Sequence, residues 1–214
     1  MVAVGEVGYD SMTAAEDEVF AAQLRLAIEH DLPVLVHTPH RDKLAGTRRT
    51  LDVVRESGID PGRVLVDHLN ELTAPVVAGS GCWLAFSVYP DTKMDEQRTV
   101  AILRELGTAR MLVNSAADWG RSDPLKTVRT AAAMRAGGFT EEQVEQVCWH
   151  NPIAFYGQSG RLLLDADAAA TGPAATGPAA TGPAAVGAVA PAREPDLAAT
   201  FAGNSVLRGA RPER

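Results

Sequence analysis

Four short apolar runs in this chain each end at, or just before, a residue type that binds metal ions. They lie in residues 2–10 (VAVGEVGYD), 32–40 (LPVLVHTPH), 64–70 (VLVDHLN) and 111–120 (MLVNSAADWG). Runs of this kind predict buried strands, and α/β folds place their chemistry at the C-terminal ends of parallel strands. Four such runs in series predict a metal centre that is built from strand ends.

Strands and helices are expected to alternate through residues 1–164. The predicted strands are 2–7, 33–37, 63–68, 82–87 and 110–114, and the predicted helices are 14–30, 47–57, 72–79, 93–106, 123–136 and 140–150. This alternation predicts an α/β fold with parallel strands and crossover helices. Five such units are too few for a closed eight-stranded barrel, so the pattern fits either an open sheet or part of a barrel.

The last fifty residues have a different composition. The pentapeptide ATGPA occurs three times between residues 170 and 184. A Gly-Pro pair in every five residues interrupts both helices and strands, so we expect a disordered low-complexity linker over 165–192. A short tail follows at 193–214, and the predicted domain covers 1–164.

Charge and hydropathy exclude several classes of protein. The net charge of −7 gives no basic surface for gripping a nucleic acid backbone. No apolar stretch reaches the roughly 18 residues of a membrane span, and no secretory signal is visible. The two cysteines, Cys82 and Cys148, lack the spacing of a zinc site and are expected to be buried thiols. We therefore expect a cytoplasmic protein without membrane insertion.

Four residues are the candidate metal ligands. Glu6 follows Gly5 inside a predicted buried strand, where a carboxylate is costly unless it is paired or bound to metal. His37 and His68 end their strands at equivalent places, and Asp118 follows the last strand. Each residue alone has an ordinary structural explanation, such as a helix cap for Asp118. Together, carboxylates and imidazoles suit zinc, manganese or magnesium.

Neighbouring residues are weaker candidates. His40 lies in the loop after the second strand, next to Pro39, where it is expected to face substrate or solvent. Trp119 is expected either to wall a substrate pocket or to lie in the core. Asp67 precedes His68, and strand alternation predicts that its side chain points to the opposite side, toward a helix.

The order of these motifs resembles the TatD-related metal-dependent hydrolases of the amidohydrolase superfamily. The matching segments are GEVGYD (5–10), FAAQL (20–24), LPVLVH (32–37), VLVDH (64–68) and NPIAF (151–155). The segment AADWGRSDPL and the closing GNSVLRG look more like the EboC-like branch of that family. The resemblance implies a TIM-type (β/α)₈ barrel with one or two divalent metals, of which this chain holds about strands 4–8.

The resemblance also implies roles for individual residues. Glu6, His37 and His68 would bind metal, and Asp118 would bind metal and help to activate water. A gapless match places Ala116 at that last position, so Asp118 reaches it only with a two-residue shift. The family's first strand carries two metal-binding histidines in an H-x-H motif, which this chain lacks. We therefore expect an N-terminally truncated chain that binds metal weakly.

The predicted function is hydrolysis of a phosphodiester, ester or amide bond by metal-activated water. The substrate would be a small molecule or a phosphodiester, because the charge does not support a nucleic acid partner. Two alternatives remain at this point. One is a catalytically inactive, truncated barrel that acts in binding or assembly. The other is a flavodoxin-like open sheet, although no Gly-rich phosphate loop opens a helix.

Overall fold

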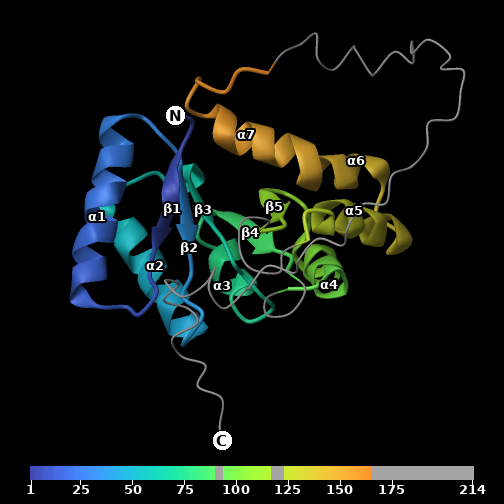
Figure 1. The fold of residues 1–214 in the computed structure, drawn as a ribbon, viewed down its shortest axis with the longest axis horizontal. Helices are drawn as coiled ribbons and strands as arrows, with labels where there is room; N and C mark the ends of the chain where they lie inside the picture. The colour runs from blue at the N-terminus through green and yellow to red at the C-terminus, as the bar shows by residue number, and fades with distance from the viewer. Residues whose placement is uncertain (90–93, 117–122, 165–214) are drawn as a thin grey trace, which may run out of the picture. The chain divides into compact units, whose positions relative to one another are not determined.

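Five parallel strands form one sheet in the order in which they occur along the chain (Figure 1). They are β1 (Val4–Gly8), β2 (Val34–His37), β3 (Val64–Val66), β4 (Trp83–Ser87) and β5 (Met111–Asn114). The computed structural model describes residues 1–89, 94–116 and 123–164. The predicted linker 165–192 and tail 193–214 lie outside the described residues. Each predicted strand is present, with ends that differ by one or two residues.

The helices follow the predicted alternation. They are α1 (Ala14–Glu29), α2 (Lys43–Ser57), α3 (Ala74–Ala78), α4 (Glu96–Leu106), α5 (Lys126–Ala136), α6 (Glu141–Glu145) and α7 (Asn151–Gly157), with a short 3₁₀ turn η1 (Pro61–Arg63) and a π-helical turn η2 (Gln146–His150). Thr140 caps α6 as expected, through a capping box with Gln143. Helix α2 begins four residues earlier than predicted, and the last predicted helix continues through η2 into α7. None of the helices in the described ranges is long and apolar enough to cross a bilayer.

The two faces of the sheet have different partners. Side chains of one face pack with apolar residues of helices α1–α6 and η2 in the main core; this strand face consists of Val7, Val34, Val36, Val64, Val66, Leu84, Phe86, Met111 and Val113. Alternate residues Leu65, Ala85 and Leu112 point to the other face and pack on Phe155 of α7. Strand alternation therefore separates a helix-covered outer face from an inner face.

Sequential strand order excludes the flavodoxin-like alternative. A doubly wound sheet reverses its strand order at a switch point and carries helices on both faces. Here the order never reverses, and the crossover helices share one face. This arrangement is that of one arc of a (β/α) barrel. Helix α7 packs against the inner face of this arc.

Helix α7, which the sequence did not predict as a separate element, fastens the N-terminal ends of the strands. Asn151 donates from Nδ2 to the carbonyls of Thr108 and Met111, each at 2.8 Å, and so holds the start of β5. Gln158 donates to the carbonyl of Gly62, just before β3, at 3.2 Å. The ring of Phe155 is fully buried on the inner face. The helix thereby spans the sheet from β5 to β3.

Two glycines allow β1 to lie unusually close to β2. A Cβ atom on Gly8 would lie 2.3 Å from the carbonyl oxygen of His37, and one on Gly5 would lie 2.7 Å from that of Leu35. Gly8 also has φ of +139°, which residues with a side chain rarely adopt. The glycines of the GEVG segment therefore bring Glu6 close to the strand that ends in His37.

Candidate metal centre

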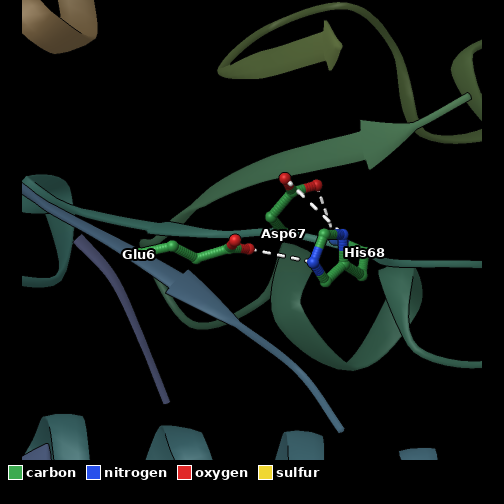
Figure 2. Close-up of side chains that lie close together, drawn as sticks. All are labelled: Glu6, Asp67 and His68. Carbon is green, nitrogen blue, oxygen red and sulfur yellow. Dashed lines mark hydrogen bonds and ion pairs between the residues drawn. The ribbon is translucent and has the colours of Figure 1, made fainter. Parts of the chain in front are cut away.

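Glu6 and His68 meet at the C-terminal side of the sheet. Glu6 lies within β1 and His68 follows β3, yet Glu6 Oε1 is 2.9 Å from His68 Nε2 (Figure 2). The Glu6 carboxylate is partly open to solvent, whereas only 16% of the His68 side chain is exposed. An ionised carboxylate can only accept hydrogen bonds, so this contact requires an electropositive group on Nε2, either a proton or a metal ion.

His37 lies beside this pair. Its ring is nearly parallel to the ring of His68, with 6.4 Å between the centroids. The Nε2 atom of His37 is buried and has no hydrogen-bond partner among the described residues; Asp10 Oδ1 is 4.0 Å away. A buried polar atom without a partner is costly in a folded protein. Such an atom beside a carboxylate and a second imidazole is typical of a metal-binding group.

The prediction for Asp67 was wrong. Its side chain is about 5% exposed and lies on the same side as His68, not toward a helix (Figure 2). The physical reason is the backbone, because β3 ends at Val66 and His68 has φ of +61°. A left-handed residue breaks the alternation of a strand and turns consecutive side chains to the same side. Glu6, Asp67 and His68 consequently place potential ligand atoms within 4.8 Å of one another.

Side chains from the two following strands surround Asp67. Ser87 Oγ, at the end of β4, lies 3.2 Å from both carboxylate oxygens and 2.7 Å from His68 Nδ1. Asn114, at the end of β5, donates from Nδ2 to Asp67 Oδ2 at 2.8 Å. The hydroxyl of Thr38 donates to the Asp67 carbonyl at 2.9 Å. The buried carboxylate is therefore fully hydrogen-bonded, as a buried charge must be.

A cavity of about 490 Å³ opens between this cluster and α7. Its described lining consists of Glu6, Leu35, Leu65, Asp67, His68, Ala85, Ser87, Leu112, Val113, Asn114, Ser115, Ala116, Pro152 and Tyr156. Burial raises the pKa of the Tyr156 phenol, and the nearby carboxylates of Asp67 and Glu6 act in the same direction. Tyr156 therefore keeps its proton and presents a hydrogen-bond donor to the cavity.

The structure brings together only part of the predicted site. Glu6 and His68 line the cavity, and His37 stacks beside them without belonging to its lining. His40 is exposed in the loop between β2 and α2. Asp118 and Trp119 lie outside the described residues.

Sequence reasoning missed two polar residues, Ser87 and Tyr156. Ser87 ends the apolar run LAFS just as His37 ends VLVH, so the strand-end rule that identified the histidines could also have found it. Tyr156 directly follows the buried Phe155, but only the fold shows that α7 faces the cavity.

The donor set fits a divalent metal ion. One carboxylate and two imidazoles, one of which has a buried nitrogen without a partner, are ligands that zinc and manganese accept. Glu6 and His68 both direct electron-rich atoms toward the same place. A cation there would satisfy both of them, whereas His37 lies outside the cluster that Glu6, Asp67 and His68 form.

Comparisons with known proteins agree with this fold. The family model described as TatD related DNase matches residues 1–157. An uncharacterized metal-dependent hydrolase from Methanocaldococcus jannaschii is 25% identical over 156 residues, which cover 73% of this chain and 61% of that protein. The chain thus spans less than two thirds of the length of this curated relative.

Solved structures with the same fold include one archaeal and one bacterial protein. A TatD-like protein from Archaeoglobus fulgidus is 27% identical with a TM-score of 0.59, over 72% of this chain and 60% of that chain. The phosphotriesterase homology protein from Escherichia coli, solved with phosphate in its active site, is 19% identical with a TM-score of 0.60, over 72% and 59%. At that identity the second match supports the fold alone.

Proposed function

This chain belongs to the TatD-related DNase family, and from that membership and its strand-end donors we propose that it is a divalent-metal-dependent hydrolase. The observation that carries the proposal is the 2.9 Å approach of Glu6 Oε1 to His68 Nε2, beside the buried, unpartnered Nε2 of His37. Glu6 and His68 make this contact at the edge of the sheet where barrel enzymes carry out their chemistry, and the ring of His37 stacks 6.4 Å from that of His68.

The proposed ligands are Glu6, His37, His68 and, beyond the described residues, Asp118. A bound zinc, manganese or magnesium ion would lower the pKa of its bound water far below that of bulk water and would polarise the bond to be cleaved. Asp118 is proposed to accept the proton of that water. Glu6 and His68 hold their positions through strand geometry, and the protonated phenol of Tyr156 offers a donor to a substrate oxygen.

The proposed substrate is a small molecule or a phosphodiester, cleaved at a phosphodiester, ester or amide bond. Within the described residues, the cavity lining contains two carboxylates but no lysine or arginine. A lining of this kind leaves the metal as the main positive charge for an anionic group. With a net charge of −7, the chain offers no electrostatic basis for gripping a long nucleic acid. His40 and Trp119 are the proposed substrate contacts.

The alternative of a catalytically inactive binding protein is not favoured. The Glu6 carboxylate, whose side chain is 38% exposed, contacts the largely buried imidazole of His68, and a pairing of this kind is typical of a functional site. Glu6, Asp67 and His68 instead form the single candidate metal cluster among the described residues.

Calorimetric titration with zinc and manganese tests the proposal on the full chain. Loss of a hydrogen-bond partner behind a metal ligand typically lowers metal affinity about 10–100-fold. Glu6→Gln and His68→Gln each change a proposed ligand, so each is expected to lower the metal affinity by more than that. His150→Gln, which changes an exposed histidine, is the matched control and leaves the affinity unchanged. The rates at which these variants hydrolyse a chromogenic phosphodiester and a chromogenic ester are expected to follow their metal affinities. Equal affinity in Glu6→Gln and the parent chain would refute the proposed site.

A further inference from the structure

Helix α1 exposes more large apolar side chains than any other helix in the described ranges. They are Val19, Leu26 and Ile28, whose side chains belong to residues that are 57%, 49% and 47% exposed. Helices α2, α3 and α4, in the middle of the arc, expose no large apolar side chain within the described ranges. A single exposed apolar residue is ordinary, but a group of them on one helix marks a surface that can bind a protein.

Two of these residues belong to an apolar stripe along α1. The stripe consists of Ala15, Val19, Ala22 and Leu26, which are spaced by four, three and four residues. This is the spacing of the core positions of a coiled coil. Ile28 lies off the stripe. The two alanines allow a second helix to approach closely, because the distance between packed helices depends on the side chains at the contact.

The stripe faces away from the rest of the arc. The core face of α1 carries Phe20 and Leu24, which are fully buried. On the side of α2, Asp17 pairs with Arg49 at 3.0 Å. Helical geometry places the stripe on neither of these sides. Figure 1 shows α1 at the end of the row of helices, beside the edge strand β1.

Two charged residues flank the stripe on one side. Glu18 and Arg25 each directly precede an apolar residue of the stripe, both are exposed, and neither forms an ion pair with another described residue. In an antiparallel pair of α1 helices, Glu18 of each copy faces Arg25 of the other. In a parallel pair, Glu18 would face Gln23 and Arg25 would face His30. Flanking charges set the orientation of paired helices, so this pattern favours the antiparallel pair.

Helix α5, at the other end of the arc, lacks this self-complementary pattern. Val128 of α5 is 65% exposed. However, Arg129 and Arg135 already form ion pairs with Asp123 and Glu141 of the same chain. An exposed apolar side chain is therefore present at both ends of the arc, but flanking charges that match a second copy are found on α1.

We propose that the stripe of α1 binds a second copy of this chain, as an antiparallel pair of α1 helices related by a twofold axis. The symmetry makes each contact twice, so the two ion pairs form together. The seam is confined to one helix of 16 residues, and we expect a weak dimer with a dissociation constant on the order of 10–100 μM. This interaction depends on neither metal binding nor hydrolysis.

Sedimentation velocity of the full chain, from low to high micromolar concentration, tests the dimer. The expected result is a monomer at low concentration and a dimer at high concentration. Leu26→Lys places a charge in the seam and should abolish the dimer. Val128→Lys changes an exposed apolar residue of α5 and is the matched control, which should dimerise like the parent; circular dichroism checks that both variants fold. A chain that stays monomeric throughout, or an unchanged dimer in Leu26→Lys, would overturn the proposal.

Charge reversal tests the identity and orientation of the partner. Glu18→Arg and Arg25→Glu each replace two attractive contacts by two repulsive ones, and each should raise the dissociation constant about tenfold. The double variant restores opposite charges and should return to within about threefold of the parent. An equimolar mixture of the two single variants should form mixed dimers. A double variant that dimerises no better than the single variants would contradict the antiparallel pairing of two α1 helices.

Discussion

The two ends of the sheet are built in opposite ways. At the N-terminal end, α7 satisfies backbone carbonyls through Asn151 and Gln158 and buries Phe155 completely. At the C-terminal end, His37 keeps a buried nitrogen that has no hydrogen-bond partner in the part of the chain that the structure describes, and His68 adopts a left-handed conformation. The side-chain amides of α7 satisfy carbonyls at one end, whereas the other end holds the unpartnered nitrogen of His37 and a left-handed His68; within the described residues, Nη1 of Arg63, just before β3, is also buried without a hydrogen-bond partner.

The distribution of left-handed residues shows the same difference. Six described residues other than glycine have a positive φ. Four of them, Met12, Asp42, His68 and Ala116, lie at the C-terminal side of the strands, and Asp31 and Arg110 lie at the other side. Strained backbone accumulates at functional sites, where the surrounding structure compensates for its cost. The comparison therefore separates a stabilising end from a functional end, as in barrel enzymes.

Removing the Phe155 ring should have the largest effect on stability. Phe155→Ala empties a fully buried position against Leu65, Ala85 and Leu112, and should lower the free energy of unfolding by about 3–5 kcal/mol. Urea unfolding measures the loss, and zinc affinity of the folded protein at low temperature should stay within about twofold of the parent. Trp149→Ala, which changes an exposed ring, is the control. A parallel loss of affinity would break the division between the two ends.

The second prediction concerns close packing at the functional end. Gly8→Ala places a methyl group against the carbonyl of His37 at a φ of +139°, and should cost about 3 kcal/mol. Metal affinity should fall with it, because His37 must move. Gly58→Ala, at a positive φ but with open space around it, is the matched control and should cost less. Retained affinity in a destabilised Gly8→Ala would show that His37 is not part of the site.

A smaller loss is expected from the hydrogen bonds of α7. Asn151→Ala leaves the buried carbonyls of Thr108 and Met111 without their side-chain donor and should cost about 2 kcal/mol. Thermal and urea unfolding measure this change. Metal affinity should be unaffected, since Asn151 lies at the opposite end of β5 from Asn114. Lower zinc affinity in the folded variant would contradict that assignment.

The smallest change in stability should come from the functional end itself. His37→Ala removes a ring whose buried Nε2 makes no hydrogen bond with any described residue, so the relief of an unsatisfied group offsets the lost packing. We expect the free energy of unfolding to change by less than about 1 kcal/mol while zinc affinity falls. A large loss of stability would indicate that His37 is a structural core residue instead.

Much of the fold could be predicted from the sequence, because apolar strand runs and helix periodicity are local signals. The five strands were placed within one or two residues, and the order of motifs identified the family. The separate helix α7 was missed, since its role depends on contacts with Gly62 and Thr108, which are far away along the chain.

The candidate site was predictable only in part. Glu6 and His68 were predicted as ligands from apolar strand runs and from the convergence of equivalent strand ends, and their side chains do lie in contact. Asp67 was assigned to the wrong side, because strand alternation fails where His68 turns left-handed. Ser87 was overlooked because a serine has no charge, and its contacts are with Asp67 and His68, which follow another strand.

The most direct test of the account is the location of a bound metal in crystals of the full chain soaked with zinc, measured by anomalous diffraction at the zinc absorption edge. We expect one strong anomalous peak between the Glu6 carboxylate and Nε2 of His68, within reach of His37, with Nδ1 of His68 still against Ser87. A peak confined to exposed histidines such as His30 or His150, with none beside Glu6, would contradict the proposed metal centre.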